Sequence, residues 1–135
     1  MKDFFTFSNL GGDYPAIEND LRLGAPTAVF GVSDSQKYLT AGLIPRPVLY
    51  ICADAVTARR AYASISTLSG KRCAYLGAKD DVLLYKDAVS KDALFKRIEG
   101  LCALFGGAEV TVAEVEAVMQ LVPASLPKIT LTVGD

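Results

Sequence analysis

The apolar residues of the chain follow two alternating patterns, which together predict an α/β fold. Short, largely apolar runs at residues 27–32, 47–53, 72–76 and 109–112 are typical of strands that are covered on both faces. Between these runs, apolar residues recur at every third or fourth position, as on one face of a helix. Strands that alternate with helices favour a parallel sheet with right-handed crossovers, so we expect three layers with helices on both faces of the sheet.

Capping residues and helix breakers set the bounds of the expected helices. Asp13 and Asp54 are predicted to cap helices that end at Gly24 and Gly70. A third helix is expected to start after the loop that follows Gly31 and to stop at Pro45, and further helices should cover residues 90–105 and 115–122. Arg59 and Arg60 are expected to face solvent.

The helix predicted over residues 90–105 has the most regular apolar stripe in the chain. Its members are Leu94, Ile98, Leu101, Cys102 and Phe105, whereas Lys91, Lys96, Arg97 and Glu99 lie largely off it. We therefore expect the stripe to face the core and Arg97 to be solvated.

A degenerate phosphate-binding motif is the main candidate for chemistry. A P-loop has the pattern Gly, four variable residues, then Gly-Lys-Ser/Thr, and Gly31 and Lys37 match it. Gln36 stands where the second glycine belongs, and Tyr38 replaces the hydroxyl that ligates Mg²⁺. We interpret the segment as a vestigial P-loop that holds no nucleotide; its residues are Gly31, Ser33, Asp34, Ser35, Gln36, Lys37 and Tyr38. No catalytic, cofactor-binding or metal site is expected.

Composition and charge further limit the partners, catalytic groups and location that we expect for the protein. The chain has 135 residues, enough for one domain, and its 14 basic and 15 acidic residues give a net charge of −1, which disfavours nucleic-acid binding by this chain alone. There is no histidine, and Cys52, Cys73 and Cys102 lie in apolar segments, as expected for core residues of a reduced protein. Neither a signal-peptide core nor an apolar run of membrane-spanning length is present, so we expect a cytoplasmic protein without membrane contact.

Parallel sheets bind ligands at the carboxyl ends of their strands. That rim is predicted to comprise residues 31–37, 53–54, 77–79 and 113–114. From residue 77 to 89 the pattern is irregular, and long loops of this kind are often interaction surfaces. The candidate interaction residues are Lys79, Asp80, Asp81 and Tyr85, together with Arg97. The alternative is that Leu83, Leu84 and Tyr85 pin the loop to the core.

The end of the chain has a different pattern from the other predicted strands. Residues 129–133 alternate between apolar residues and threonine, as a half-exposed strand does, and the predicted sheet offers them no evident partner. We expect the chain to be part of a longer protein.

Taken in order, these features resemble a known family. The segments that carry the likeness are residues 31–37, 47–54, 84–87, 110–120 and 129–135, and they span nearly the whole chain. In this order and spacing they resemble the N-terminal module of the bacterial transcription-repair coupling factor, which is similar to the nucleotide-excision repair subunit UvrB. Two positions depart from the family: Tyr14 replaces the glutamine that reads adenine in UvrB, and Glu114 replaces a helix-capping serine.

The resemblance implies a RecA-like, P-loop NTPase half-domain with a degenerate P-loop over residues 1–127, with residues 128–135 beginning the following module. It implies a non-catalytic scaffold and interaction module in transcription-coupled DNA repair, without ATPase activity of its own. The implied partners are other modules of the same chain, UvrA through the following module, and RNA polymerase and DNA through other domains.

Two alternatives remain open. The first is a functional P-loop nucleotide-binding or ATPase domain, with Lys37 on phosphate and Asp54 on Mg²⁺. The second is a small α/β domain that binds an unrelated ligand at the rim of its sheet.

Overall fold

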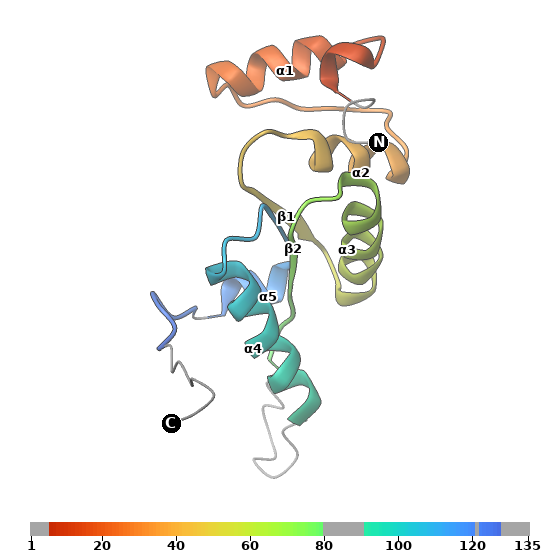
Figure 1. Cartoon of the computed structure of the whole chain (residues 1–135). Coiled ribbons are helices and arrows are strands. Elements are labelled where there is room, and N and C mark those ends of the chain that lie inside the picture. The colour runs from red at the N-terminus through yellow and green to blue at the C-terminus, as the bar shows by residue number, and fades with distance from the viewer. Residues whose placement is uncertain (1–5, 80–90, 121, 128–135) are drawn as a thin grey trace.

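The computed structural model describes residues 6–79, 91–120 and 122–127 (Figure 1). After a single 3₁₀ turn at Phe7–Asn9, the elements follow in the order α1 (Tyr14–Leu23), α2 (Asp34–Leu43), β1 (Val48–Cys52), α3 (Ala55–Ser69), β2 (Cys73–Leu76), α4 (Lys91–Phe105), β3 (Val110–Glu114) and α5 (Val115–Met119). From β1 onward, strands and helices alternate as the apolar pattern predicts.

The described strands form one parallel sheet of three, in the order β1, β3, β2. The chain passes from β1 beyond the position of β3 to form β2, and then returns to the centre of the sheet. Because parallel crossovers are right-handed, two connections that run in opposite directions place their helices, α3 and α4, on opposite faces. Figure 1 shows α3 and α4 on either side of the strands. The prediction of a parallel α/β fold is confirmed.

The first face of the sheet carries the main core. Ala58 and Ile65 of α3 are fully buried against Val110 and Val112 of β3. The alanine lets the helix approach the central strand closely, while the isoleucine contributes about 2 to 3 kcal/mol by leaving water. The helix α2 packs on α3 and adds Tyr38 to this core.

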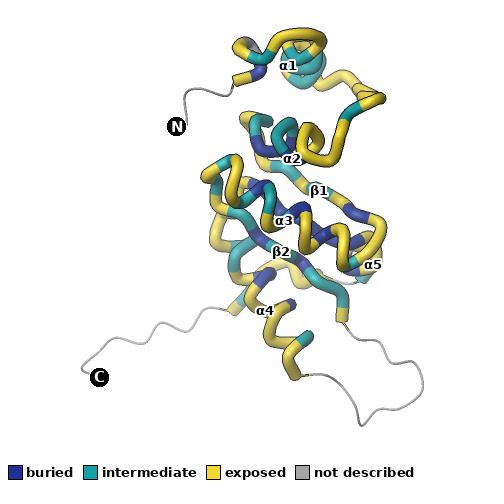
Figure 2. The backbone as a smooth tube through the Cα atoms, turned by 90° about the vertical axis from the view of Figure 1, so that its right-hand side faces the viewer, coloured by how far each residue is buried: buried dark blue, intermediate teal, exposed yellow. Residues whose placement is uncertain are grey.

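The second face of the sheet is covered over only part of its width. Leu101 of α4 packs with Leu76, Ala113 and Ala117, a group that we call the second cluster. Phe105 and Leu126 lie against this cluster. The burial map in Figure 2 shows the buried positions concentrated on the strands and on the helix faces that meet them, whereas the α1 end of the chain has mostly exposed positions.

The apolar run at residues 27–32 is not a strand, so that prediction is wrong. Val29 and Phe30 are 43% and 88% exposed. The run follows α1 rather than the sheet, since the Thr27 hydroxyl lies 3.3 Å from Asp20 Oδ2 and donates to it. An apolar run becomes a strand only where a neighbouring backbone is in register with it, and the sequence does not reveal that neighbour.

The helix α4 is rotated relative to the predicted stripe. Its buried residues are Arg97, Gly100 and Leu101, while Leu94 and Ile98 are 42% and 44% exposed. The cause is Gly100, where a Cβ atom would stand 2.0 Å from the Tyr75 carbonyl oxygen. The absence of a side chain allows this part of the helix to approach β2 more closely than the apolar stripe could.

Of the remaining predictions, some are confirmed and others are wrong. Asp54 and Gly70 bound α3 as expected, whereas Asp13 precedes α1 without a side-chain hydrogen bond to it. Cys52 is buried, but Cys102 is exposed, so the prediction of a core position for Cys102 is wrong.

The strand predicted at residues 129–133 lies outside the described residues. None of the described helices is both long enough and apolar enough to cross a lipid bilayer.

Candidate functional site

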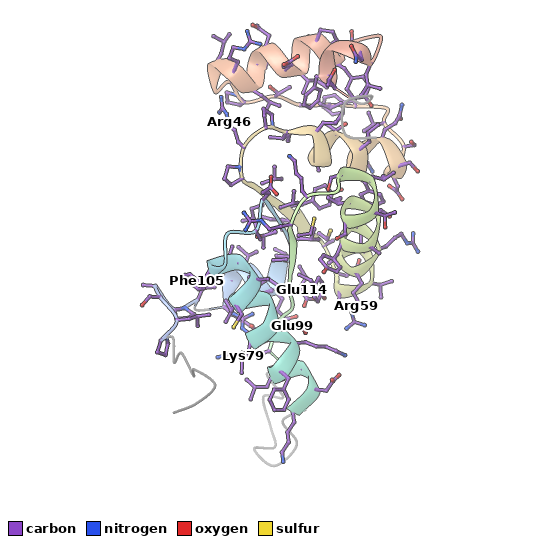
Figure 3. All side chains as sticks on the ribbon, viewed as in Figure 1. Arg46, Arg59, Lys79, Glu99, Phe105 and Glu114 are labelled. Carbon is purple, nitrogen blue, oxygen red and sulfur yellow. The ribbon has the colours of Figure 1, made fainter. Side chains whose placement is uncertain are left out.

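The carboxyl ends of β2 and β3 border a hollow of about 390 Å³, which we call the rim hollow. Arg59 from α3 and Lys96 from α4 line opposite sides, and Glu114 lies at the end of β3. Figure 3 labels three of the lining residues: Arg59 on α3, Lys79 after β2 and Glu114 at the end of β3. Two of the four segments expected at the rim, residues 77–79 and the end of β3, line the hollow, whereas residues 31–37 and 53–54 do not.

A second hollow of about 510 Å³ continues from the first between α3 and α4. Arg59, Tyr75 and Lys96 line both hollows, and Tyr62 and Glu99 belong to the second. The ammonium group of Lys96 is paired with Asp92. Cationic and anionic side chains are therefore mixed along the hollows, and no cluster of one sign favours a phosphate or a cation there.

Three polar side chains hold the backbone that leaves β2. Arg97 Nη1 donates a hydrogen bond of 2.7 Å to the Gly77 carbonyl, and the Ala78 amide donates one of 2.5 Å to Glu114 Oε1. The Lys79 amide donates to Gln120 Oε1 at 2.7 Å. We call Arg97, Glu114 and Gln120 the exit clamp. It fixes residues 77–79 from three separate elements of the chain. The Gly77 carbonyl and the Ala78 amide are partly buried and need such partners, whereas the Lys79 amide is bound at the surface.

The sequence indicated only part of this clamp. Arg97 is 2% exposed rather than solvated, and a buried guanidinium needs hydrogen-bond partners, one of which is the Gly77 carbonyl. Glu114 holds the N-cap position of α5 but makes no side-chain cap hydrogen bond, because its carboxylate accepts from the Ala78 amide instead. The sequence did place Glu114 at the rim, because the end of a parallel strand lies there, but it did not predict the Ala78 amide as its partner.

The N-terminus of α2 is capped by side chains of its own first turn. Gln36 and Ser33 form a capping box, in which the Ser33 amide donates to Gln36 Oε1 at 2.8 Å and the Gln36 amide donates to Ser33 Oγ at 3.4 Å. Gln36 stands where a P-loop has its second glycine, and its side chain accepts a hydrogen bond from the Ser33 backbone N–H group. No described strand precedes Gly31, so the strand that leads into a P-loop is absent at this place.

Lys37 and Tyr38 also have partners within the protein. Lys37 Nζ lies 3.2 Å from Asp34 Oδ1, an exposed pair one helical turn apart. Tyr38 is 5% exposed, and its ring meets Tyr50 of β1 edge-on, with 6.2 Å between centroids. Burial raises the pKa of Tyr50, and negative charge at Cys52, Tyr38 and Asp34 raises it further. Tyr38 is thus a core residue and does not face a metal position.

Asp54 has the cap role predicted for it. Its carboxylate accepts from the Thr57 amide at 2.8 Å and from the Thr57 hydroxyl at 2.9 Å. The hydrogen bond from the Thr57 amide is the main reason that the pKa of Asp54 is lowered, with the hydroxyl next. Nearby, burial raises the pKa of the Cys52 thiol, and Asp54 adds to this effect. A thiol held protonated in this way is a poor nucleophile.

The residues predicted as an interaction surface are only partly brought together. Lys79 is exposed beside the rim hollow, but the Arg97 side chain points into the protein. Asp80, Asp81 and Tyr85 lie outside the described residues, and so do Leu83 and Leu84. Among the described residues, no three side chains of His, Cys, Asp or Glu lie close enough to hold a metal ion.

Comparisons of the chain with models of known protein families, with curated proteins and with solved structures find no match.

Proposed function

We propose that the chain is a non-catalytic, RecA-like module of a bacterial transcription-repair coupling factor. In this role residues 1–127 form the UvrB-like domain, and they act as a scaffold and an interaction module in nucleotide-excision repair in the cytoplasm. The observation that carries the proposal is the state of the segment from Gly31 to Tyr38, where the groups that would hold a nucleotide are engaged within the protein.

The physical argument concerns three groups that a P-loop needs. Backbone N–H groups must close around the phosphates, a lysine must reach them, and a hydroxyl must ligate Mg²⁺. Here Gln36 accepts from the Ser33 amide, Asp34 pairs with Lys37, and a buried tyrosine replaces the hydroxyl. A nucleotide would have to displace all of these contacts, which supports a role without ATP.

The apolar surface of α4 supports a role in interaction. Leu94, Phe95 and Ile98 are 42%, 65% and 44% exposed on neighbouring turns of one helix. Contiguous apolar side chains on a small domain are typical of a surface that meets another protein or module. In a coupling factor, this surface would contact another module of the same chain, while UvrA, RNA polymerase and DNA would be bound by the following module and the other domains.

The absence of nucleotide binding is tested by calorimetric titration of the protein with ATP and Mg²⁺. We expect no binding heat at millimolar nucleotide, and the same result for Lys37→Ala. Micromolar binding that is lost in Lys37→Ala would overturn the proposal in favour of a working P-loop domain.

The role in repair is tested in cells in which the gene that encodes this sequence is deleted. We expect these cells to lose the faster repair of transcribed over non-transcribed DNA strands, and we expect both the wild-type gene and the Lys37→Ala gene to restore it. Strand bias that persists after deletion contradicts the assignment to transcription-coupled repair. Failure of Lys37→Ala alone to restore it contradicts the non-catalytic role.

A further inference from the structure

The outer edge of β2 is covered by α4. The Arg72 carbonyl accepts from β3, so in the alternation of a parallel ladder the backbone groups of Tyr75 and Gly77 point away from β3. Both carbonyls meet α4: Gly100 lies against the carbonyl of Tyr75, and Arg97 donates to the carbonyl of Gly77 at 2.7 Å. A further strand therefore cannot pair with the sheet at these positions.

No described element pairs with the outer edge of β1. The Val48 amide donates to β3, to the Glu109 carbonyl at 2.9 Å. Because alternate residues of a parallel ladder face the same neighbour, Leu49 and Ile51 direct their backbone groups away from β3. Among the described residues, no group hydrogen-bonds to the backbone of either one, and they are 54% and 52% exposed. This edge therefore offers unpaired donors and acceptors together with apolar side chains, the pattern on which another strand adds.

A second copy of the same edge fits this one in an antiparallel register. Most soluble homo-oligomers are twofold dimers, and a twofold axis perpendicular to the sheet brings β1 of both copies together in opposite directions. With the axis at Tyr50, Leu49 of each copy lies opposite Ile51 of the other, and each such pair exchanges two backbone hydrogen bonds. The two Tyr50 rings become a cross-strand aromatic pair. Pro47 has no amide to donate and so bounds the ladder at both ends.

The charges that flank β1 select this register. Arg46 precedes the strand and Asp54 follows it, and both are exposed (Figure 3 labels Arg46). They are equally far from Tyr50 along the chain, so the axis places Arg46 of each copy opposite Asp54 of the other. A slip by two residues, which keeps the backbone groups facing each other, separates these charges. Opposite charges on facing strands are favourable, and a net charge of −1 produces little repulsion between the copies.

Arg46 and Asp54 both keep hydrogen-bonding capacity for this contact. Arg46 Nη2 donates to the Arg22 carbonyl at 3.3 Å, and a guanidinium has further N–H donors. Asp54 accepts two hydrogen bonds from Thr57, whereas a carboxylate can accept about four. The contact between copies therefore does not require loss of the α3 cap.

We propose that the outer edge of β1 pairs with the same edge of a second copy of this chain, so that two sheets join into one. The backbone groups of Leu49 and Ile51 form the ladder, and two reciprocal contacts between Arg46 and Asp54 set its register. The inference does not depend on the proposed function, because it rests only on the open edge and on the charges beside it.

The first test is amide hydrogen exchange of the full chain, measured by NMR at protein concentrations from micromolar to millimolar. We expect the Leu49 and Ile51 amides to exchange at least about threefold more slowly at the highest concentration, because the second copy then binds them. The Val48 and Tyr50 amides already face β3, so they are the internal controls and should not change. Fast exchange of the Leu49 and Ile51 amides at every concentration would overturn the proposal and would favour a strand from another protein at this edge.

The second test is sedimentation equilibrium of charge variants whose folding is verified by circular dichroism. Arg46→Glu puts like charges at both ends of the ladder, and we expect it to raise the dissociation constant of the dimer at least about tenfold. Addition of Asp54→Asn should recover part of this loss, because asparagine removes the repulsion and still caps α3.

The matched control is Arg59→Glu, at an exposed arginine that lines the hollows beside β2, and it should leave the dissociation constant unchanged. A monomer at every concentration, a dimer that Arg46→Glu does not weaken, or the absence of recovery in the double variant would each overturn the pairing of β1 with β1.

Discussion

Replacement of Gly100 by alanine should destabilise the protein, although alanine is the better helix former. A Cβ atom at this position would stand 2.0 Å from the Tyr75 carbonyl oxygen and 3.1 Å from its carbonyl carbon, where ordinary contact begins at 3.4 Å. Both neighbours are backbone atoms of β2, so neither can rotate away. The helix α4 has to move outward from the strand, and the motion disturbs what α4 buries.

The magnitude follows from the contacts that the displacement weakens. Overpacking at such a position costs about 1 to 3 kcal/mol. The hydrogen bond from buried Arg97 to the Gly77 carbonyl, 2.7 Å long, is strained by the same motion and is worth about 1.5 to 3 kcal/mol because its donor is charged. The change from glycine to alanine in a helix returns about 1 kcal/mol. We expect a net loss of about 1.5 to 5 kcal/mol.

The assay is urea unfolding followed by far-ultraviolet circular dichroism, with Gly42→Ala as the comparison. At Gly42, an added Cβ would meet the Ser69 Cβ at 2.9 Å, so a shift between two helices relieves the contact and the expected loss is smaller. A gain of about 1 kcal/mol in Gly100→Ala, as for an exposed helical glycine, would refute the close approach of α4 to β2.

Three further predictions concern polar groups that are buried or half-buried. Arg97→Met should lower the free energy of unfolding by about 1.5 to 3 kcal/mol and speed amide exchange at residues 77–79, because the exit clamp loses one member; unchanged stability would mean a solvated side chain. Ser66→Ala should raise the free energy of unfolding by about 0.5 to 1.5 kcal/mol, since Ser66 Oγ is buried without a hydrogen-bond partner among the described residues; a loss measured by thermal unfolding would contradict this. Tyr50→Phe should reduce the loss of stability at alkaline pH. The pKa of Tyr50 is raised from 10.0 in the folded state, so above pH 10.0 the unfolded state releases its proton first and stability falls as pH rises; parallel pH–stability curves for the two proteins would refute the assignment.

The local features of the fold were predictable from the chain because they depend on neighbouring residues. Asp54 and Gly70 bound α3 through hydrogen bonds and a backbone conformation that involve only adjacent turns. The apolar run at residues 47–53 produced β1. In each case the deciding interaction lies within a few positions along the chain.

The features that the sequence did not predict depend on contacts between distant residues. Residues 27–32 have the composition of a strand, but they are tied to α1 by Thr27. Arg97 has the pattern of a surface residue, yet the carbonyl that it binds comes from Gly77, twenty positions earlier. The exit clamp joins three elements that are adjacent only after β3 has entered the sheet between β1 and β2.

The sequence by itself determined the alternation of strands and helices from β1 onward and the residues that bound α3, because propensity and capping act locally. Only the tertiary structure decided which face of α4 is buried, which backbone groups the charged residues hold and which part of the sheet stays uncovered. Those outcomes depend on how closely Gly100 lets one helix approach one strand, and that distance exists only once the chain has packed.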